Sequence, residues 1–182
     1  IMIGEIRARD TMDYGITFAE TGHLCLSTLH ANNSNQAMDR IINFFPEERH
    51  KQLFLDLSLN LKAVVSQRLI PKKDGSGRCV AVEILINTPL IADMIEKGDI
   101  PGIKEVMKRS REQGMQTFDQ AIYDLYMANE ITYEEALKNS DSENEVRLMI
   151  KLGPKEGDTI SSDIDGLTIQ PDEDESGHIK SW

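Results

Sequence analysis

The sequence predicts an α/β fold that is followed by a group of short helices. Three patterns predict it. Two apolar segments with a helical pattern between them fill residues 1–29. A glycine-rich turn separates two strand-like runs between residues 67 and 86. After residue 101, short helical patterns follow one another, each opened by a polar capping residue.

The first segments predict a parallel βαβ unit. Residues 1–6 form an apolar, β-branched run typical of a buried strand. Residues 10–20 carry apolar positions at helical spacing, and Gly22 is a natural helix stop. Residues 23–29 form the next strand. Two strands joined by a helix within about 30 residues are typical of parallel pairing. Because the chain opens inside an apolar strand, we expect it to be truncated within its core.

Residues 33–97 predict more helices and a hairpin. Asn33 and Gln36 resemble a capping pair. Pro46 fits the first turn of a helix that should run to about Ser66. Asp74-Gly75, between the strands 67–71 and 78–86, is a strong hairpin signal. Thr88-Pro89 then opens a short helix to about Lys97. We therefore expect a mainly parallel-sheet region over residues 1–97.

The rest of the chain divides into helices and a tail. Thr117 with Gln120, and Thr132 with Glu135, are capping boxes within a helical part that covers residues 98–152. Residues 153–182 are acidic and poor in apolar side chains. Such a segment cannot bury enough surface to offset its ordering entropy, so disorder is expected there.

Composition excludes several classes of protein. The 182 residues carry a net charge of −11, so the basic surface typical of nucleic-acid binding is missing. No apolar run reaches the roughly 18–20 residues of a membrane span. The two cysteines, Cys25 and Cys79, form no disulfide framework, and buried reduced thiols of a cytoplasmic protein are expected.

Glu5, Arg7 and two histidines are the candidate site residues. An acid just beyond a parallel strand lies at the sheet edge where such folds bind ligands. There Glu5 could hold Mg²⁺ through water or orient an attacking water, or it could form a structural ion pair with Arg7. His23 and His30 are seven positions apart, so on one strand they would face opposite sides. His30, at the carboxyl end, is the better ligand, although a purely structural role for either histidine stays open.

The remaining groups add little from the residues alone. Thr28 could serve as a hydroxyl donor, and Arg7 could bind phosphate. Ser27 with His30 makes a weak catalytic pair, because no GxSxG turn or partner acid accompanies it. The chain also has no GxxxxGK[ST] phosphate loop. By itself it therefore carries half of a nucleotide site at best.

The order of the motifs resembles a known family. Residues 1–7 (IMIGEIR) resemble the end of a Walker B strand, residues 19–32 a histidine box, and residues 39–46 the helix that follows. The segments SQRLI (66–70) and GMQTFD (114–119) come later in the same order. Over about residues 1–150 the chain resembles the ATPase domain of PilT/PilU-type type IV pilus retraction ATPases, and it leans towards the PilU branch.

The resemblance implies a RecA-like P-loop NTPase core, truncated at its N-terminus, with a C-terminal helical subdomain. It implies a cytoplasmic hexamer, peripheral to the inner membrane, that hydrolyses ATP with Mg²⁺ to power pilus retraction. The partners implied are identical subunits or a homologous retraction ATPase, and the inner-membrane platform protein. Glu5 matches the Walker B glutamate near Mg²⁺ and the attacking water, and His30 the histidine expected to sense the γ-phosphate. His23 matches the first histidine of the box, and Arg7 matches the motif arginine of the family pattern. Together with Thr28, these two residues are expected to bind the nucleotide.

Three departures limit what is carried over. Ala8 stands where the family usually has aspartate, so a salt bridge or helix cap is lost, which Asp10 could partly replace. Ala92 stands where the PilT motif has arginine. The phosphate loop is missing, so the fragment alone should be inactive. The alternative is an accessory partner of another retraction motor. Extension and secretion ATPases are disfavoured, because their four metal-binding cysteines are absent.

Overall fold

The computed structural model describes residues 1–153 of the chain, and the predicted disorder of the tail lies outside these residues apart from Gly153. The strands are β1 (Met2–Glu5), β2 (Leu26–Thr28), β3 (Ala63–Pro71) and β4 (Arg78–Ile86). The α-helices are α1 (Arg9–Glu20), α2 (Ser34–Asn43), α3 (Glu47–Asn60), α4 (Pro89–Glu96), α5 (Ile103–Arg109), α6 (Phe118–Met127), α7 (Tyr133–Asn139) and α8 (Glu143–Leu152). A short 3₁₀ helix, η1, spans Arg111–Gln113. No helix among residues 1–153 is long and apolar enough to cross a membrane.

The predicted βαβ unit is confirmed. β1 and β2 are parallel neighbours, with Met2 opposite Leu26 and Glu5 opposite Thr28. Helix α1 joins them and ends at Thr21, followed by Gly22 at φ +87°, a left-handed conformation that glycine adopts without steric cost. The prediction of a strand over residues 23–29 was too long, because only Leu26–Thr28 pair with β1. His23 therefore precedes the strand.

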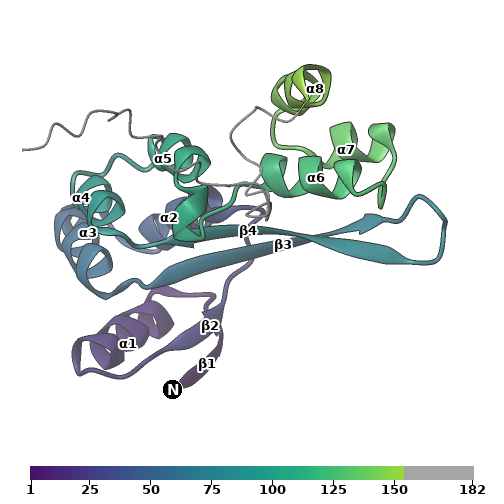
Figure 1. The fold of residues 1–182 in the computed structure, drawn as a ribbon. Coiled ribbons are helices and arrows are strands. Elements are labelled where there is room, and N and C mark those ends of the chain that lie inside the picture. Colours follow the sequence, from purple (N-terminus) through teal and green to yellow (C-terminus); the bar gives the residue numbers. More distant parts are fainter. Residues whose placement is uncertain (154–182) are drawn as a thin grey trace, which may run out of the picture.

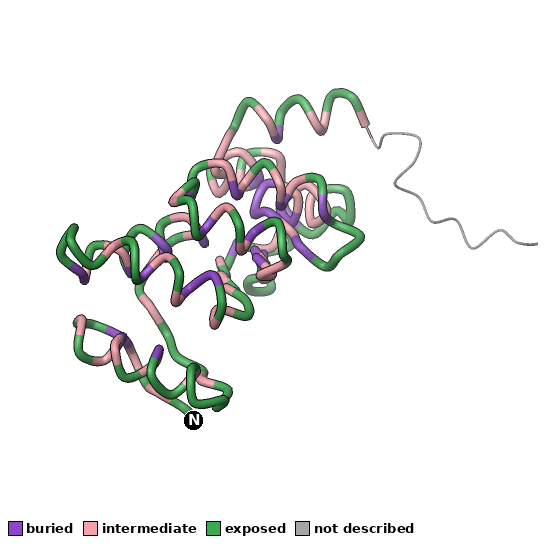
Figure 2. Tube along the Cα trace, turned by 90° about the vertical axis from the view of Figure 1, so that its left-hand side faces the viewer, coloured by how far each residue is buried: buried purple, intermediate pink, exposed green. Residues whose placement is uncertain are grey.

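The first strand is less buried than its sequence predicted. Met2 is 84% exposed, and the strand alternates between exposed and half-buried positions. Among the described residues β1 pairs only with β2, so one of its edges carries no neighbouring strand. Figure 2 shows this mostly exposed part of the chain near the N-terminus.

The hairpin of β3 and β4 is the sheet against which most of the remaining helices pack (Figure 1). Its two strands pair antiparallel over their whole length, from Ala63 opposite Ile86 to Pro71 opposite Arg78. The turn residues include Gly75 at φ +71°, as the Asp-Gly signal predicted. The prediction that the preceding helix runs to Ser66 was wrong, because α3 ends at Asn60. Residues 63–65 pair with β4 instead, and the β-branched valines there favour a strand.

Helices cover one face of the hairpin. In Figure 1, α2, α4 and α5 lie over one half of it, and α6 to α8 lie over the half nearer the turn, while the βαβ unit lies on the other side. The face under the helices carries alternate residues of both strands, which are less exposed than their neighbours. The sheet of residues 1–97 is therefore not mainly parallel, since this larger sheet is antiparallel.

The buried apolar side chains form two clusters. The larger one gathers residues of α1 to α5 with Leu85 of β4, and its most buried members include Met38, Ile91 and Ile103. The smaller one joins Ile70 and Ala81 of the hairpin to Phe118 and Ile122 of α6. Each cluster draws on residues before and after position 97, and the proposed division into 1–97 and 98–152 stays a prediction.

The predicted helix caps are confirmed in part. Thr132 accepts a hydrogen bond from the Glu135 amide but does not form the predicted reciprocal capping box, and Pro46 is the N-cap residue of α3 rather than part of its first turn. The Asn33 side chain accepts a hydrogen bond from the Gln36 amide, and Thr88 accepts one from Ile91. Thr117 and Gln120 form a capping box at the start of α6. Cys25 and Cys79 are free thiols, as expected, but both are half-buried rather than buried.

Candidate functional site

Glu5 and His30 meet at one end of the parallel strand pair. Glu5 is the last residue of β1, and His30 follows β2 by two residues. The backbone bond from Ile6 N to Thr28 O, 2.9 Å long, holds the two strand ends together. As a result, Nε2 of His30 lies 3.0 Å from Oε1 of Glu5. The structure therefore brings together the two residues predicted to act in catalysis.

Arg7 completes the arrangement around Glu5. Its guanidinium lies 2.5 Å from the second carboxylate oxygen, Oε2. The hydrogen bond from Arg7 lowers the pKa of Glu5, and the charges of Arg7, His30 and Arg40 add to this effect against the opposing influence of desolvation. Glu5 has 21% of its side chain exposed, whereas Arg7 and His30 have 76% and 74% exposed. The site is thus an ionised carboxylate with two exposed basic partners.

A shallow cavity of about 410 Å³ adjoins His30. Gln36, Arg40 and Asn43 of α2 line it together with His30, Ala31 and Phe44. The three α2 residues lie four and three positions apart, so they share one face of the helix. Sequence reasoning missed Arg40 as a site residue. The available signal was its position four residues after Gln36, on one face of the helix that follows His30.

His23 and Thr28 lie at opposite ends of β2. Thr28 is the register partner of Glu5 and is exposed at the same sheet edge. His23 lies before the strand, where its Nδ1 is 3.1 Å from Oγ1 of Thr21 and its ring packs edge-on against Phe18. The structure thus separates His23 from the Glu5–His30 contact. The sequence analysis separated the two histidines because alternate residues of one strand face opposite sides. The structure separates them for another reason, since His23 lies before β2.

The donor set limits how Mg²⁺ could be held. Within residues 1–153, no group of three or more His, Cys, Asp or Glu side chains could bind a metal ion. Mg²⁺ commonly uses one or two carboxylates, with waters and substrate phosphates filling the other positions. Glu5 fits that pattern, but both of its oxygens already contact basic side chains. A contact through water preserves those pairs, whereas direct ligation displaces one of them.

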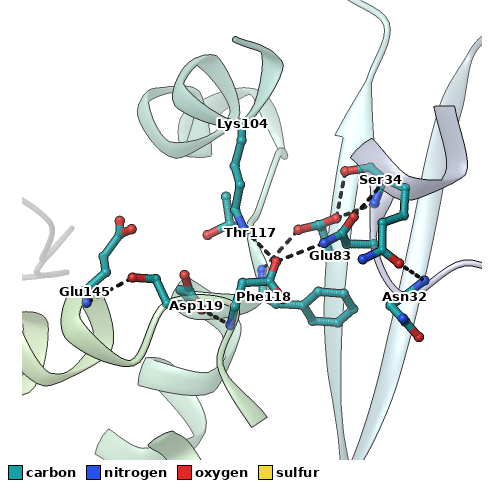
Figure 3. Close-up of polar contacts among 12 residues, drawn as sticks. Asn32, Ser34, Glu83, Lys104, Thr117, Phe118, Asp119 and Glu145 are labelled. Carbon is teal, nitrogen blue, oxygen red and sulfur yellow. Dashed lines mark hydrogen bonds and ion pairs between the residues drawn. The ribbon is translucent and has the colours of Figure 1, made fainter. Parts of the chain in front are cut away.

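A second polar group, which the sequence did not reveal as functional, lies on the covered face of the hairpin. Glu83 of β4 is 1% exposed. Its Oε1 accepts hydrogen bonds from the amide and the hydroxyl of Ser34, both 2.7 Å long, and its Oε2 accepts one of 3.4 Å from the Phe118 amide (Figure 3). The signal in the sequence was an acid at a position of β4 that the strand alternation assigns to the buried face.

Asp119 and Asp141 lie next to this group. Asp119, at the start of α6, accepts hydrogen bonds from the amides of Asp141 and Ser142, and burial raises the pKa of its carboxyl. Burial also acts to raise the pKa of Asp141, but hydrogen bonds from Lys104 and Arg68, both 2.5 Å long, lower it overall. These contacts tie the start of α8 to α5 and β3.

Comparison with known proteins places the chain in a family. A family model described as Type II/IV secretion system protein matches residues 1–153. The Type IV pilus ATPase PilU of Pseudomonas aeruginosa is 60% identical over 179 residues, which cover 97% of this chain and 47% of PilU. The Type IV pilus retractation ATPase PilT of the same organism is 37% identical over 136 residues, which cover 75% of this chain and 39% of PilT.

Solved structures agree with these sequence relatives. The crystal structure of the pilus retraction motor PilT with bound ADP is similar with a TM-score of 0.74 and 35% identity, over 82% of this chain and 41% of that one. The ATPase DotB of Yersinia pseudotuberculosis is similar with a TM-score of 0.67 and 27% identity, over 77% of this chain and 36% of DotB. These matches confirm the predicted fold class and the resemblance to PilT/PilU-type ATPases.

The chain spans less than half the length of each of these relatives. The family model nevertheless covers every residue that the structure describes. This chain therefore belongs to the Type II/IV secretion system protein family, with the PilU and PilT ATPases among its relatives.

Proposed function

We propose that the chain forms the γ-phosphate side of the ATP site in a hexameric type IV pilus retraction ATPase. The observation that carries the proposal is the contact between Glu5 and His30 at the carboxyl edge of β1 and β2. Ligands of open α/β folds bind at this edge. The names of the PilU and PilT relatives support the choice of ATP hydrolysis over other phosphate chemistry.

The proposed roles follow from the charges at the site. Glu5 is ionised at neutral pH, because its pKa is lowered, and it can accept a proton or a hydrogen bond from the attacking water. His30 is largely exposed and lies beside Glu5, so it can donate a hydrogen bond to a phosphate oxygen that approaches this edge. Mg²⁺, when bound, neutralises the charge that develops on the phosphate oxygens, and Glu5 would hold it through water.

Further residues of the chain would bind the nucleotide. Arg7 and Arg40 supply positive charge near Glu5, and Thr28 offers a hydroxyl at the same edge. His23 is kept as a prediction from the resemblance, and its position gives it no part in the Glu5–His30 contact. A phosphate loop has to come from residues outside this chain, because its sequence lacks the GxxxxGK[ST] pattern, and the chain alone is therefore expected to be inactive.

The assembly and its location are part of the same proposal. The subunits would form a homo-hexamer, or a mixed ring with a homologous retraction ATPase, on the cytoplasmic side of the inner membrane. The membrane platform protein of the pilus would be the partner that receives the motion. The relatives that are named as pilus ATPases support this placement.

The experiment replaces Glu5 by Ala in the full-length protein that contains this segment. We expect ATP hydrolysis to fall by about 10²-fold or more, while nucleotide binding stays close to normal, because Glu5 acts on the reaction more than on binding. Glu20→Ala is the matched control, since Glu20 is exposed at the end of α1 and outside the site. Normal turnover in the Glu5→Ala variant would overturn the proposal.

An accessory role in another retraction motor is the second candidate. It is favoured by Ala92 in place of the arginine of the PilT motif and by Ala8, which gives α1 no side-chain cap. A pull-down with the homologous motor, using the chain with and without residues 153–182, tests this role. Failure to bind in both forms would count against it.

A further inference from the structure

Glu83 lies on β4 between residues that belong to the two hydrophobic clusters. It is a fully buried carboxylate in the middle of β4, on the face that the helices cover. Leu85, two residues along the strand, belongs to the larger cluster, and Ala81, two residues the other way, belongs to the smaller one. Whatever Glu83 binds is therefore held at the junction of the two halves of the structure.

The partners of Glu83 are the first residues of two helices. Ser34 opens α2 and Phe118 opens α6. The amides of a first helical turn have no partner within their own helix, and they favour a negative charge nearby. One carboxylate satisfies both helix starts, with Oε1 on Ser34 and Oε2 on Phe118. Figure 3 shows Glu83 between these two residues.

Helix α2 links Glu83 to the candidate ATP site. Its first residue, Ser34, comes shortly after His30 in the chain, and its exposed face carries Gln36 and Arg40 into the cavity beside His30. The position of Ser34 therefore fixes the end of the segment 31–33, which connects His30 to α2, and the start of the α2 face that lines the cavity.

Other contacts hold the connecting segment from the same side. Arg68 of β3 donates a hydrogen bond of 3.2 Å to the carbonyl of Asn32. The side-chain amide of Asn33 donates a hydrogen bond of 3.2 Å to the carboxylate of Asp141. Arg68 also stacks over the Phe118 ring, 4.0 Å from its centre. The segment after His30 is thus fastened to the part of the molecule that includes α6 and the start of α8.

We propose that Glu83 is a positioning residue for the ATP site. By holding Ser34 and Phe118 to one carboxylate, it sets how His30 and Arg40 approach Glu5. This inference rests on the proposed function. Glu83 would act on ATP hydrolysis without touching the nucleotide, through the positions of His30 and Arg40.

The test replaces Glu83 by Gln in the full-length protein. Glutamine has the same shape, but one oxygen becomes an NH₂ group, which cannot accept a hydrogen bond. It can therefore hold only one of the two helix starts, and its NH₂ faces an N–H of the other. We expect kcat to fall roughly ten- to a hundredfold, because small misplacements of reacting groups have effects of this size, while the KM for ATP changes by less than about threefold.

The matched control is Thr117→Val. Thr117 caps the same helix, α6, and is fully buried, but its hydroxyl forms its hydrogen bonds with Gln120, and not with Glu83 or Ser34. Its replacement should lower the melting temperature and leave kcat near the wild-type value. If kcat falls equally in both variants, the effect tracks stability and the inference is overturned. A normal kcat in a folded Glu83→Gln variant overturns it as well.

A milder variant keeps the test decisive if Glu83→Gln does not fold. Ser34→Ala removes the hydroxyl bond to Glu83 and retains the amide bond. A fall in kcat that Thr117→Val does not share supports the inference, and equal values for the two overturn it. Loss of turnover in Glu5→Ala together with normal turnover in the Glu83 and Ser34 variants rejects this inference alone. Turnover that does not depend on Glu5 rejects the proposed function instead.

Discussion

Nε2 of His30 lies 3.0 Å from Oε1 of Glu5, although Glu5 ends β1, His30 follows β2, and helix α1 separates the two strands in the sequence. The parallel register of β1 and β2 produces this contact, since Glu5 is opposite Thr28. Parallel strands end at the same sheet edge, so a short polar segment after each one is enough to build the pair.

The two histidines are expected to differ sharply when they are replaced. His30→Ala in the full-length ATPase should lower kcat by about 10²-fold, a typical effect of removing one positioned hydrogen-bond donor. His23→Ala should change kcat by less than about threefold, because His23 contacts Thr21 and Phe18 at the other end of β2. Steady-state ATP hydrolysis measures both. Equal losses in the two variants would contradict the placement of the site.

Restoring a cap at Ala8 is expected to stabilise α1. Ala8 has the extended conformation of an N-cap residue, φ −147° and ψ 161°, but no side chain that can accept a hydrogen bond. Ala8→Asp or Ala8→Asn would supply an acceptor for the free amides of the first turn and should raise the free energy of unfolding by about 1 kcal/mol. That corresponds to about 2–4 °C in melting temperature for a chain of this size.

The control for this prediction is Ala8→Val, which adds volume without an acceptor and should give no gain. Thermal unfolding followed by circular dichroism makes the comparison. If Asp10, which already lies in the first turn, compensates fully for the missing cap, neither capping variant will raise the melting temperature and the prediction is wrong.

The helix starts were predictable from the sequence because their chemistry is local. Asn33 with Gln36 and Thr117 with Gln120 lie three positions apart, and the same spacing puts the side chain against the amide that it caps. The Asp-Gly turn of the hairpin is local in the same way. The Glu5–His30 pair needed one more step, the parallel pairing of two adjacent strands.

The errors occurred where pairing between distant residues decides the structure. Val64 and Val65 lie in the range predicted to be helical, yet they pair with Leu85 and Ile84 of β4. Their β-branched side chains fit the strand, and the long-range pairing overrides the helical pattern. Glu83 was missed for the same reason, because its partners Ser34 and Phe118 come from helices far away in the sequence.

Asp141 is expected to stabilise the fold in a pH-dependent way. Its pKa is lower in the folded state than in the unfolded chain, so its contribution is complete above the ordinary aspartate pKa of about 3.9. As the pH falls below that value, the unfolded chain takes up the proton first, and the contribution is lost as the pH passes through the folded-state pKa. Asp141→Asn should therefore cost about 1–3 kcal/mol at neutral pH, since Lys104 and Arg68 lose a charged acceptor.

Urea unfolding of wild type and Asp141→Asn from neutral pH down to about pH 3 checks this prediction. The difference in unfolding free energy should be constant near neutral pH and shrink below about pH 4. Asp93→Asn is a suitable control, because Asp93 pairs with Lys97 on the exposed side of α4 and should contribute little. A difference that stays constant down to pH 3 would contradict the assigned role of the ion pairs.

The 182-residue chain is expected to self-associate when it is made alone. The face of the hairpin opposite α2 and α4 to α8 presents Val65, Leu69 and Val80, which are 66%, 59% and 46% exposed, and Leu69 is the register partner of Val80. Neighbouring apolar side chains of this kind promote association in water.

Light scattering at increasing concentration should show dimers or larger species, and the double variant Val65→Lys with Leu69→Lys should reduce them. Leu59→Lys, which is 67% exposed on α3, should leave most of the association in place because it lies off this face. A wild-type chain that stays monomeric at high concentration would contradict the prediction.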